Sequence, residues 1–235
     1  MIQPQEQRGI AENPVGPTSA RIQPVQRPAP LRQTVYEALV DLVVGGTLPP
    51  GQHLVEGRTC QATRCQPPAG PRSLHRLEAE GWVDLRPGQG AFVHVPTEHE
   101  VDRLLDVRSL LGAEAARIAA CGASDEAVAR LRARLREGAD ALAHDDPGRI
   151  VAANSALHAE ITALSGNAIL TELAAIAEWR LRWYQRPVAH SRGQQSWRAH
   201  EALIDAIEAG DPAQAAEVMR HHVEMTRHAY HHRPM

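Results

Sequence analysis

The chain contains 235 residues, of which 43% are hydrophobic, so it can form one or two domains with buried cores rather than a disordered chain. Its net charge is −3, and residues 1–95 carry nine arginines against eight acidic residues. Charge alone therefore does not indicate nucleic-acid binding. No apolar run approaches the roughly 20 residues that span a bilayer, and the first residues lack a signal-peptide pattern. The three cysteines show no paired metal spacing, so we expect a reducing, cytoplasmic environment.

The first part of the chain predicts a small domain of helices and two strands. Residues 1–30 are rich in Pro, Gln and Gly and are expected to form a disordered extension. Helical spacing begins at Leu31 and stops at Gly45-Gly46. Residues 82–85 and 91–95 are strand candidates, and the turn-forming residues 86–90 between them predict a β-hairpin. Residues 31–95 therefore predict one domain.

From residue 97 onward the pattern predicts only helices. Thr97 with Glu100 predicts a capping box, Ser124 an N-cap, and Asp211-Pro212 an N-cap followed by a first-turn proline. One of these helices carries an apolar stripe made of Ile169, Leu173, Ile176, Leu181 and Tyr184. The spacing of such stripes predicts an all-α domain of six or seven helices over residues 97–230.

Three motifs in the first domain share an order and spacing. They are Leu48-Pro49-Pro50-Gly51-Gln52-His53-Leu54-Val55-Glu56, then Leu74-His75-Arg76-Leu77-Glu78-Ala79-Glu80-Gly81-Trp82-Val83, then Arg86-Pro87-Gly88-Gln89-Gly90-Ala91-Phe92-Val93. Together they resemble the winged helix-turn-helix of the GntR family of bacterial transcription regulators. The resemblance implies binding to double-stranded DNA, through a homodimer that reads a palindromic operator.

The second domain resembles the all-helical effector domain, called FCD, of the FadR subfamily of GntR regulators. The matching segments are 106–111, Leu157-His158, Ser165-Gly166-Asn167, 200–207, Gly210-Asp211 and 219–223. The resemblance implies a mainly α fold with an N-terminal winged helix-turn-helix, a small β-hairpin wing and a C-terminal FCD-like bundle. It also implies a ligand-responsive regulator that senses a small molecule and either represses or activates genes by binding an operator.

The segment that should hold the recognition helix is unusual. Residues 66–72 contain three prolines and a glycine, which are unfavourable inside a helix. Reading back-translated codons for residues 59–73 one base later gives Leu-Ala-Arg-Arg-Leu-Gly-Val-Ser-Arg-Pro-Pro-Val-Arg-Glu-Ala, which resembles the family's helix-turn-helix. A frame-shift within this segment explains both the prolines and the preserved length. The alternative is genuine divergence with lost or altered DNA binding.

The winged-helix resemblance implies a set of DNA contacts. These predicted DNA-binding residues are Arg58, Gln66, Arg72, Arg76, Arg86 and Gly88. Gln66 suits a base edge or a phosphate, arginines suit phosphates, and a glycine at the wing tip permits close approach to the minor groove. For Arg76 the alternative is an ordinary solvated surface arginine.

Thirteen histidines occur in the chain, and three of them share a helix face with core residues. His158 follows Leu157, His200 lies just before Leu203, and His222 follows Met219. One histidine on an apolar face is usually a satisfied core residue, but three on separate helices of one bundle are better explained by convergence on a cavity. Imidazole suits Zn²⁺ or Ni²⁺, so we expect a divalent transition metal there.

The FCD resemblance extends this metal site. Its metal-binding members have a carboxylate four residues before the first histidine, where this chain has Asn154. The implied ligands are therefore His158, His200 and His222, with Asn154 as a neutral and weaker fourth ligand, while the adjacent His221 points away. Arg108 matches an arginine near the effector cavity and is expected to bind the carboxylate of a small organic acid.

Three functions remain open from the sequence. The first is a ligand-responsive transcription regulator whose small carboxylate effector binds at the metal site. The second is a ligand-sensing interaction protein without working DNA binding. The third is a metal-dependent enzyme, which three histidines with an open metal position would permit. No general base is placed beside the histidines, because Glu160 and Glu201 face elsewhere on their helices, so the regulator is favoured.

Overall fold

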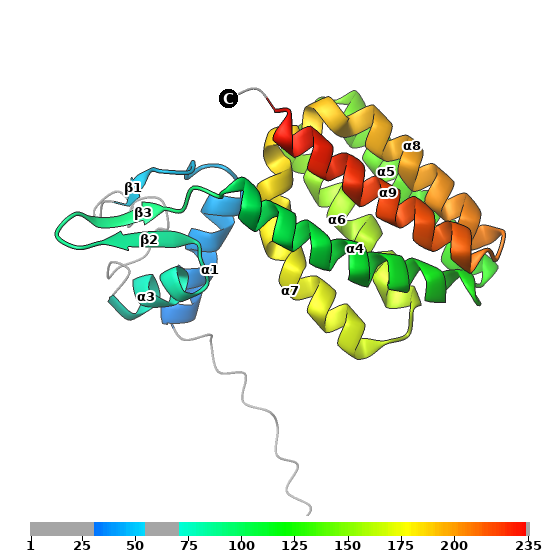
Figure 1. Ribbon diagram of the computed structural model, residues 1–235, viewed down its shortest axis with the longest axis horizontal. Helices are drawn as coiled ribbons and strands as arrows, with labels where there is room; N and C mark the ends of the chain where they lie inside the picture. Colours follow the sequence, from blue (N-terminus) through cyan, green and yellow to red (C-terminus); the bar gives the residue numbers. More distant parts are fainter. Residues whose placement is uncertain (1–30, 55–70, 234–235) are drawn as a thin grey trace, which may run out of the picture.

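The computed structural model describes residues 31–54 and 71–233, and it is mainly helical (Figure 1). The N-terminal part contains α1 (Leu31–Val44), β1 (His53–Leu54), α3 (Pro71–Ala79), β2 (Val83–Arg86) and β3 (Gly90–Val93). The C-terminal part contains α4 (Glu98–Ala120), α5 (Asp125–Ala143), α6 (Pro147–Leu164), α7 (Ala168–Gln185), the 3-10 turn η1 (Arg186–Val188), α8 (Ala189–Glu208) and α9 (Pro212–His231). The two parts lie at opposite ends of the molecule (Figure 1).

The wing contains one more strand than the sequence predicts. β2 and β3 form the expected antiparallel hairpin, with Val83 opposite Val93. β1 pairs antiparallel with the other edge of β3, where His53 faces Phe92, and the sheet order is β1-β3-β2. A strand of two residues is too short to show an alternating pattern, which is why the sequence did not reveal it.

The helix after the proline cluster begins at its last proline. α3 starts at Pro71, and its apolar side, which includes the buried Leu77, packs against α1 and β2. Proline fits the first turn of a helix because the N–H that it lacks has no partner there in any case. The expectation that this proline-rich segment is unfavourable for a helix is therefore wrong at Pro71, where α3 begins. Residues 55–70, where the rest of the predicted recognition segment falls, lie outside the described residues.

The predicted helix caps in the second part are confirmed. Thr97 and Glu100 form a reciprocal capping box at the start of α4, and the Ser124 hydroxyl accepts a hydrogen bond from the first turn of α5. The Asp211 carboxylate accepts from the backbone N–H of Gln214, with Pro212 in the first turn of α9. These local signals fix where the long helices begin, because each satisfies a backbone N–H that would otherwise lack a partner.

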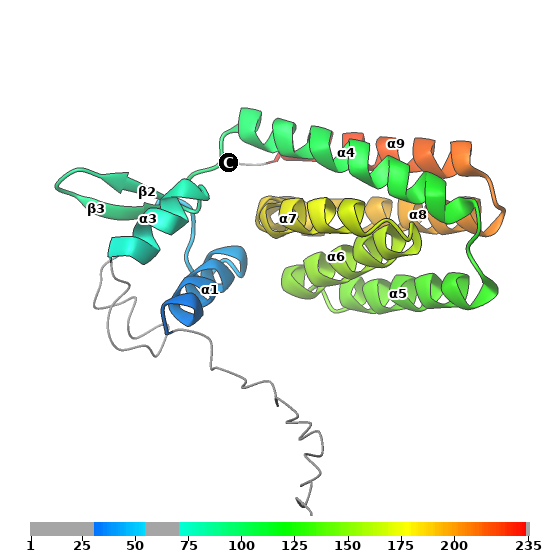
Figure 2. The ribbon, with the colours of Figure 1, turned by 90° about the horizontal axis from the view of Figure 1, so that it is seen from below.

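Residues 98–231 form a bundle of six α-helices, α4 to α9, together with η1. Figure 2 shows α4 and α9 along one side, α5 on the opposite side, and α7 and α8 between them. Its core includes Leu105, Leu131, Ile161, Leu203 and Met219, each at most 1% exposed. The bundle therefore closes around an interior in which any polar side chain needs a specific partner.

Helix α7 joins the two parts of the molecule. The indole rings of Trp82, before β2, and Trp183, on α7, have centroids 5.7 Å apart. The Arg180 guanidinium donates a hydrogen bond to the main-chain carbonyl of Glu80. α7 also packs against α1. A movement of α7 would therefore displace the parts of the N-terminal domain that contact it.

Part of the apolar stripe predicted on α7 does not face the core. Leu181 and Tyr184 are buried, but Ile169, Leu173 and Ile176 are exposed by 66%, 49% and 67%. Together with nearby apolar residues of α4 and α7 they make an exposed apolar face, defined here as Val107, Leu110, Ile169, Leu173, Ile176 and Trp179. An amphipathic pattern shows that a helix face is apolar, but it does not show whether that face packs within the same chain.

Candidate metal centre and effector cavity

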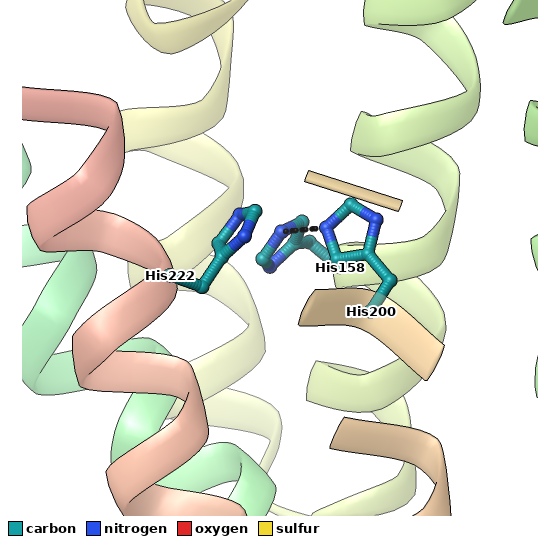
Figure 3. Close-up of side chains that lie close together, drawn as sticks. All are labelled: His158, His200 and His222. Atoms are coloured by element: carbon teal, nitrogen blue, oxygen red, sulfur yellow. Dashed lines mark hydrogen bonds between the residues drawn. The ribbon is translucent and has the colours of Figure 1, made fainter. Parts of the chain in front are cut away.

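Three histidines from three helices meet inside the bundle. His158 on α6, His200 on α8 and His222 on α9 offer ring nitrogens that all lie within 4.8 Å of one another (Figure 3). The three side chains are 7%, 0% and 2% exposed. The convergence expected from their shared face with core residues is therefore present, because each helix turns its apolar side toward the same interior.

The ring nitrogens of this cluster have few hydrogen-bond partners among the described residues. Nε2 of His158 and Nε2 of His200 face each other at 3.3 Å, while Nδ1 of His200 and Nδ1 of His222 are buried without a hydrogen-bond partner. Buried polar atoms normally find partners, so this arrangement is costly unless another group fills it. A borderline-soft divalent cation such as Zn²⁺ or Ni²⁺ fits a set of three imidazoles.

Burial also keeps these imidazoles neutral. Desolvation, reinforced by the positive charge of Arg108, holds the pKa of His158 well below its usual range. Desolvation, reinforced by Arg108 and Arg192, lowers the pKa of His200 to about 3. A neutral imidazole presents a lone pair, which is the form that binds a metal. The cluster is thus ready to ligate a cation at neutral pH without first losing protons.

Asn154 lies one helical turn before His158 and is 7% exposed. Its side-chain amide nitrogen donates to the Oε1 atom of Gln185 at 3.0 Å. This bond fixes the orientation of the amide and engages its nitrogen, so the carbonyl oxygen is the atom that would ligate a metal. The role of Asn154 as a fourth ligand stays a prediction.

A cavity of about 380 Å³ opens beside His158 between α4, α6 and α7. Its polar lining includes Arg108, Ser155, His158, Thr162 and Glu178. The Arg108 guanidinium is 6% exposed; its Nη1 donates to Glu178 at 2.7 Å, while its Nη2 has no partner. A cavity of this size with a buried, half-satisfied guanidinium suits a small anionic molecule.

The sequence-based prediction of this site did not include two polar residues that lie near it, Glu178 and Arg192. Glu178 on α7 pairs with Arg108 and also accepts a hydrogen bond from the Ser155 hydroxyl. Arg192 on α8 is 5% exposed, and its Nη1 donates to the main-chain carbonyl of His222 at 3.4 Å. Helical spacing does place Arg192 on the same face as His200, two turns earlier, and this signal was available. No sequence signal pairs Glu178 with Arg108, because 70 residues separate them.

The predicted DNA-binding residues are spread over the N-terminal domain, and two of them, Arg58 and Gln66, lie outside the described residues. Arg72 lies in the first turn of α3. Arg76 is engaged within the protein, because its Nε donates to Glu80 at 2.9 Å and its guanidinium lies 3.9 Å from the Tyr36 ring centroid. Arg76 thus has a structural role whatever else it contacts.

The wing presents the remaining two predicted contacts. Gly88 is exposed at the turn between β2 and β3 and has a φ of 72°, a left-handed conformation that favours glycine. The exposed Arg86 packs its guanidinium over the Phe92 ring at 4.2 Å from the centroid. This cation–π contact holds the charge next to the turn of the wing hairpin, because Arg86 is the last residue of β2.

Comparisons by sequence identify both parts of the chain. Residues 31–93 match the bacterial regulatory proteins of the gntR family, and residues 103–225 match the FCD domain. The fold and these matches define a DNA-binding regulator with a helical effector domain. The chain belongs to the GntR family of transcription regulators that carry an FCD domain. It is therefore a ligand-responsive DNA-binding transcription regulator and not an enzyme.

Solved structures share this fold. A GntR transcriptional regulator from Rhodococcus sp. RHA1 is 20% identical with a TM-score of 0.70, covering 85% of this chain and 96% of the other. McbR/YncC of E. coli is 18% identical with a TM-score of 0.67, covering 86% and 98%. Lar, which controls expression of the Listeria monocytogenes agr system, is 14% identical with a TM-score of 0.59, covering 87% and 98%. A search of characterised proteins found no significant match.

The mainly α fold with an N-terminal winged helix-turn-helix and an FCD bundle is thus confirmed, as is the predicted class of function. Among the helices described here, none combines the length and hydropathy that crossing a bilayer requires.

Proposed function

We propose that this regulator senses a small organic acid at a metal site in its helical domain and represses genes when the acid is absent. The observation that carries the proposal is the meeting of three neutral, buried histidines beside a cavity that also contains the half-satisfied Arg108. A bound Zn²⁺ or Ni²⁺ would supply a positive centre that a carboxylate can coordinate. His158, His200 and His222 would hold the ion, with Asn154 as a fourth ligand, and Arg108 would orient the acid.

The route from effector to DNA runs through α7. Glu178 contacts Arg108 at the cavity, and Arg180, two residues further along, holds the main chain of Glu80 in the DNA-binding domain. An acid that takes the place of Glu178 on Arg108 would release this part of α7 and shift it relative to α4. Because α7 also packs against α1 and Trp82, such a shift alters the placement of the DNA-binding domain.

The exposed apolar face is the proposed homodimer interface. Its six residues lie on α4 and α7, and five of them are large aliphatic or aromatic side chains exposed by more than 44%. Apolar faces of this kind usually mark a contact with another protein. A two-fold dimer formed there would present two DNA-binding domains to a palindromic operator in the cytoplasm.

A screen of small organic acids on the zinc-loaded chain tests the sensor function. We expect at least one acid to raise the melting temperature, to be recovered unchanged when followed by NMR, and to lose its effect in Arg108→Ala. Steady conversion of that acid, lost in His158→Ala, would instead indicate an enzyme. A complete lack of stabilising acids would favour the interaction-protein alternative, with the metal acting only as a structural clamp.

A further inference from the structure

Arg192 is a buried cation that the protein leaves without a counter-charge. It is 5% exposed, and its Nη2 atom has no hydrogen-bond partner. Within residues 31–54 and 71–233, no carboxylate forms an ion pair with it. Its hydrogen bond to the carbonyl of His222 is long, at 3.4 Å, and that acceptor carries no net charge. This differs from Arg108, which has Glu178 as a partner.

Burying the charge of Arg192 without a counter-charge destabilises the folded protein. Removing an ion from water costs several kcal/mol even after relaxation, and only a close opposite charge with good geometry offsets that cost. Burial lowers the pKa of Arg192 to about 10, so the guanidinium stays protonated at neutral pH. The chain therefore carries a permanent, uncompensated positive charge inside its effector domain. A ligand that brings a negative charge would relieve it.

The space beside Arg192 is small and polar. A cavity of about 30 Å³ is lined by Asn154, Gln185, Arg192 and Thr226, among others. That volume holds a water or a single small polar group, since a water needs about 10–15 Å³ on the same measure. It does not hold a whole effector. One carboxylate end of a larger molecule matches both the size and the charge.

This small cavity and the 380 Å³ cavity lie beside the same part of α6. Asn154 lines the small one and His158, one turn later, lines the large one, and no residue lines both. Arg108 lines the large cavity together with His158, and Arg192 donates a hydrogen bond to the main-chain carbonyl of His222. The two guanidinium groups therefore both lie near the histidine cluster, each with one free nitrogen.

The metal ligands themselves supply no negative charge. Their donor atoms are imidazole nitrogens at His158, His200 and His222, and Asn154 stands where the FCD resemblance implies a carboxylate. A divalent ion held here would add two positive charges in a region that already contains two buried guanidinium groups. An effector with one carboxylate leaves part of that charge uncompensated, whereas one with two or three carboxylates balances it.

We propose that Arg192 binds a second carboxylate of the effector, while the first carboxylate accepts hydrogen bonds from Arg108. The effector is then a compact di- or tricarboxylate. The proposal rests on the proposed function of the histidine cluster as a metal and acid site. It assigns to Arg192 the selection of multiply charged acids over singly charged ones. Arg108, by contrast, binds the carboxylate of any acid that enters the larger cavity, whether that acid carries one charge or several.

The test compares matched acids on the zinc-loaded full-length chain by isothermal titration calorimetry. Succinate is paired with butyrate, glutarate with pentanoate, and citrate is added as a tricarboxylate. Because the second carboxylate would gain a charge-assisted hydrogen bond from Arg192, the better diacid should bind about tenfold or more tightly than its monoacid. Arg192→Met should bring that ratio close to one and leave monoacid binding within about twofold of wild type.

Two control variants separate selectivity from folding. Arg198→Met removes an exposed arginine from the same helix and should keep the wild-type ratio. The melting temperature of ligand-free Arg192→Met should equal or exceed that of wild type, because the variant removes an uncompensated buried charge. A purely structural role for Arg192 predicts the opposite result: a lower melting temperature with an unchanged ratio.

Each remaining outcome has a defined meaning. Acid binding with equal affinity for monoacids and diacids, or a ratio that Arg192→Met leaves unchanged, overturns this inference and leaves the proposed function standing. Stabilisation by inorganic phosphate that depends on Arg192, without any preference for diacids, also overturns it. If zinc binds and no acid binds, the proposed function falls together with the inference.

Discussion

Arg108 on α4 donates a 2.7 Å hydrogen bond to Glu178 on α7, and both residues line the larger cavity. The bond uses one nitrogen of a buried guanidinium and leaves another free. Glu178 therefore occupies the position that an incoming carboxylate would compete for.

Glu178→Gln should raise the affinity for the effector acid. The neutral amide competes less strongly for Arg108, so we expect acids to bind about tenfold more tightly, measured by titration calorimetry on the zinc-loaded chain. The ligand-free variant should lose about 2 kcal/mol of stability, because a charge-assisted hydrogen bond is lost beside a buried guanidinium. Glu172→Gln, an exposed change on the same helix, is the matched control. Weaker acid binding in Glu178→Gln would count against the competition.

His200→Ala and His222→Ala should each abolish retention of a divalent metal, because three imidazoles are the least that would hold the ion. His221→Ala is the control, since His221 is exposed on the same helix, one residue from His222. Elemental analysis of protein grown with Zn²⁺ and Ni²⁺ measures retention. Chelation should lower the melting temperature of wild type and His221→Ala only. Metal-free wild type after such growth would refute the site.

His94 should stabilise the junction between wing and bundle at low pH. Burial alone would lower the pKa of His94, but hydrogen bonds and charges from Asp84, at 2.8 Å, and Glu100, at 3.2 Å, outweigh it and raise the pKa. The folded state therefore holds the proton more tightly. The resulting stability is complete below the ordinary value of 6.5 and is lost as pH rises through the folded pKa.

The check is urea unfolding of wild type and His94→Gln at pH 5.5 and 8.5. Wild type should exceed the variant by about 0.5–1 kcal/mol more at the lower pH, a modest value because both carboxylates are partly exposed and screened by solvent. His99→Gln, at an exposed position of α4, should show no such difference. Equal differences at the two pH values would disprove the role assigned to His94.

The frame-shift hypothesis predicts a gain of DNA binding. The chain as printed should bind its upstream intergenic DNA weakly, whereas a chain in which residues 59–73 carry the shifted reading should bind tightly, with an affinity that falls as salt rises. The shifted reading supplies four arginines and the helix-turn-helix pattern of the family, with two adjacent prolines in place of the three prolines of residues 67–71. Gel-shift titrations of both chains on the same fragment compare them. Equally tight, sequence-specific binding by the printed chain would reject the frame-shift.

Ile176→Glu and Leu110→Glu should convert a dimer into monomers, because each places a charge in the middle of the exposed apolar face. We expect the dimer dissociation constant to rise by at least about a hundredfold, measured by analytical ultracentrifugation. Ala129→Glu, an exposed change on α5 away from this face, serves as the control. A wild type that sediments as a monomer, or variants that stay dimeric, would place the interface elsewhere.

Local signals in the sequence predicted the helix starts and the three histidines well. Caps such as Asp211 act within a few residues, and His158, His200 and His222 share a period with core side chains, so one chain suffices to find them. Partners far apart in the chain were not predictable in this way. The pairing of Arg108 with Glu178 and the junction role of His94 depend on how helices are placed in space, which periodicity does not encode.

The contact between Arg180 and the main-chain carbonyl of Glu80 makes the two halves of the regulator separable in evolution. Since the acceptor belongs to the backbone, substitutions of the DNA-reading side chains leave the joint intact. The condition is Gly81, which has a φ of 70° and where an added Cβ would lie 3.1 Å from the Arg180 guanidinium. A DNA-binding domain with new operator specificity can therefore be grafted onto this sensor, provided that it keeps glycine at that position together with Trp82 and the side of α1 that packs against α7.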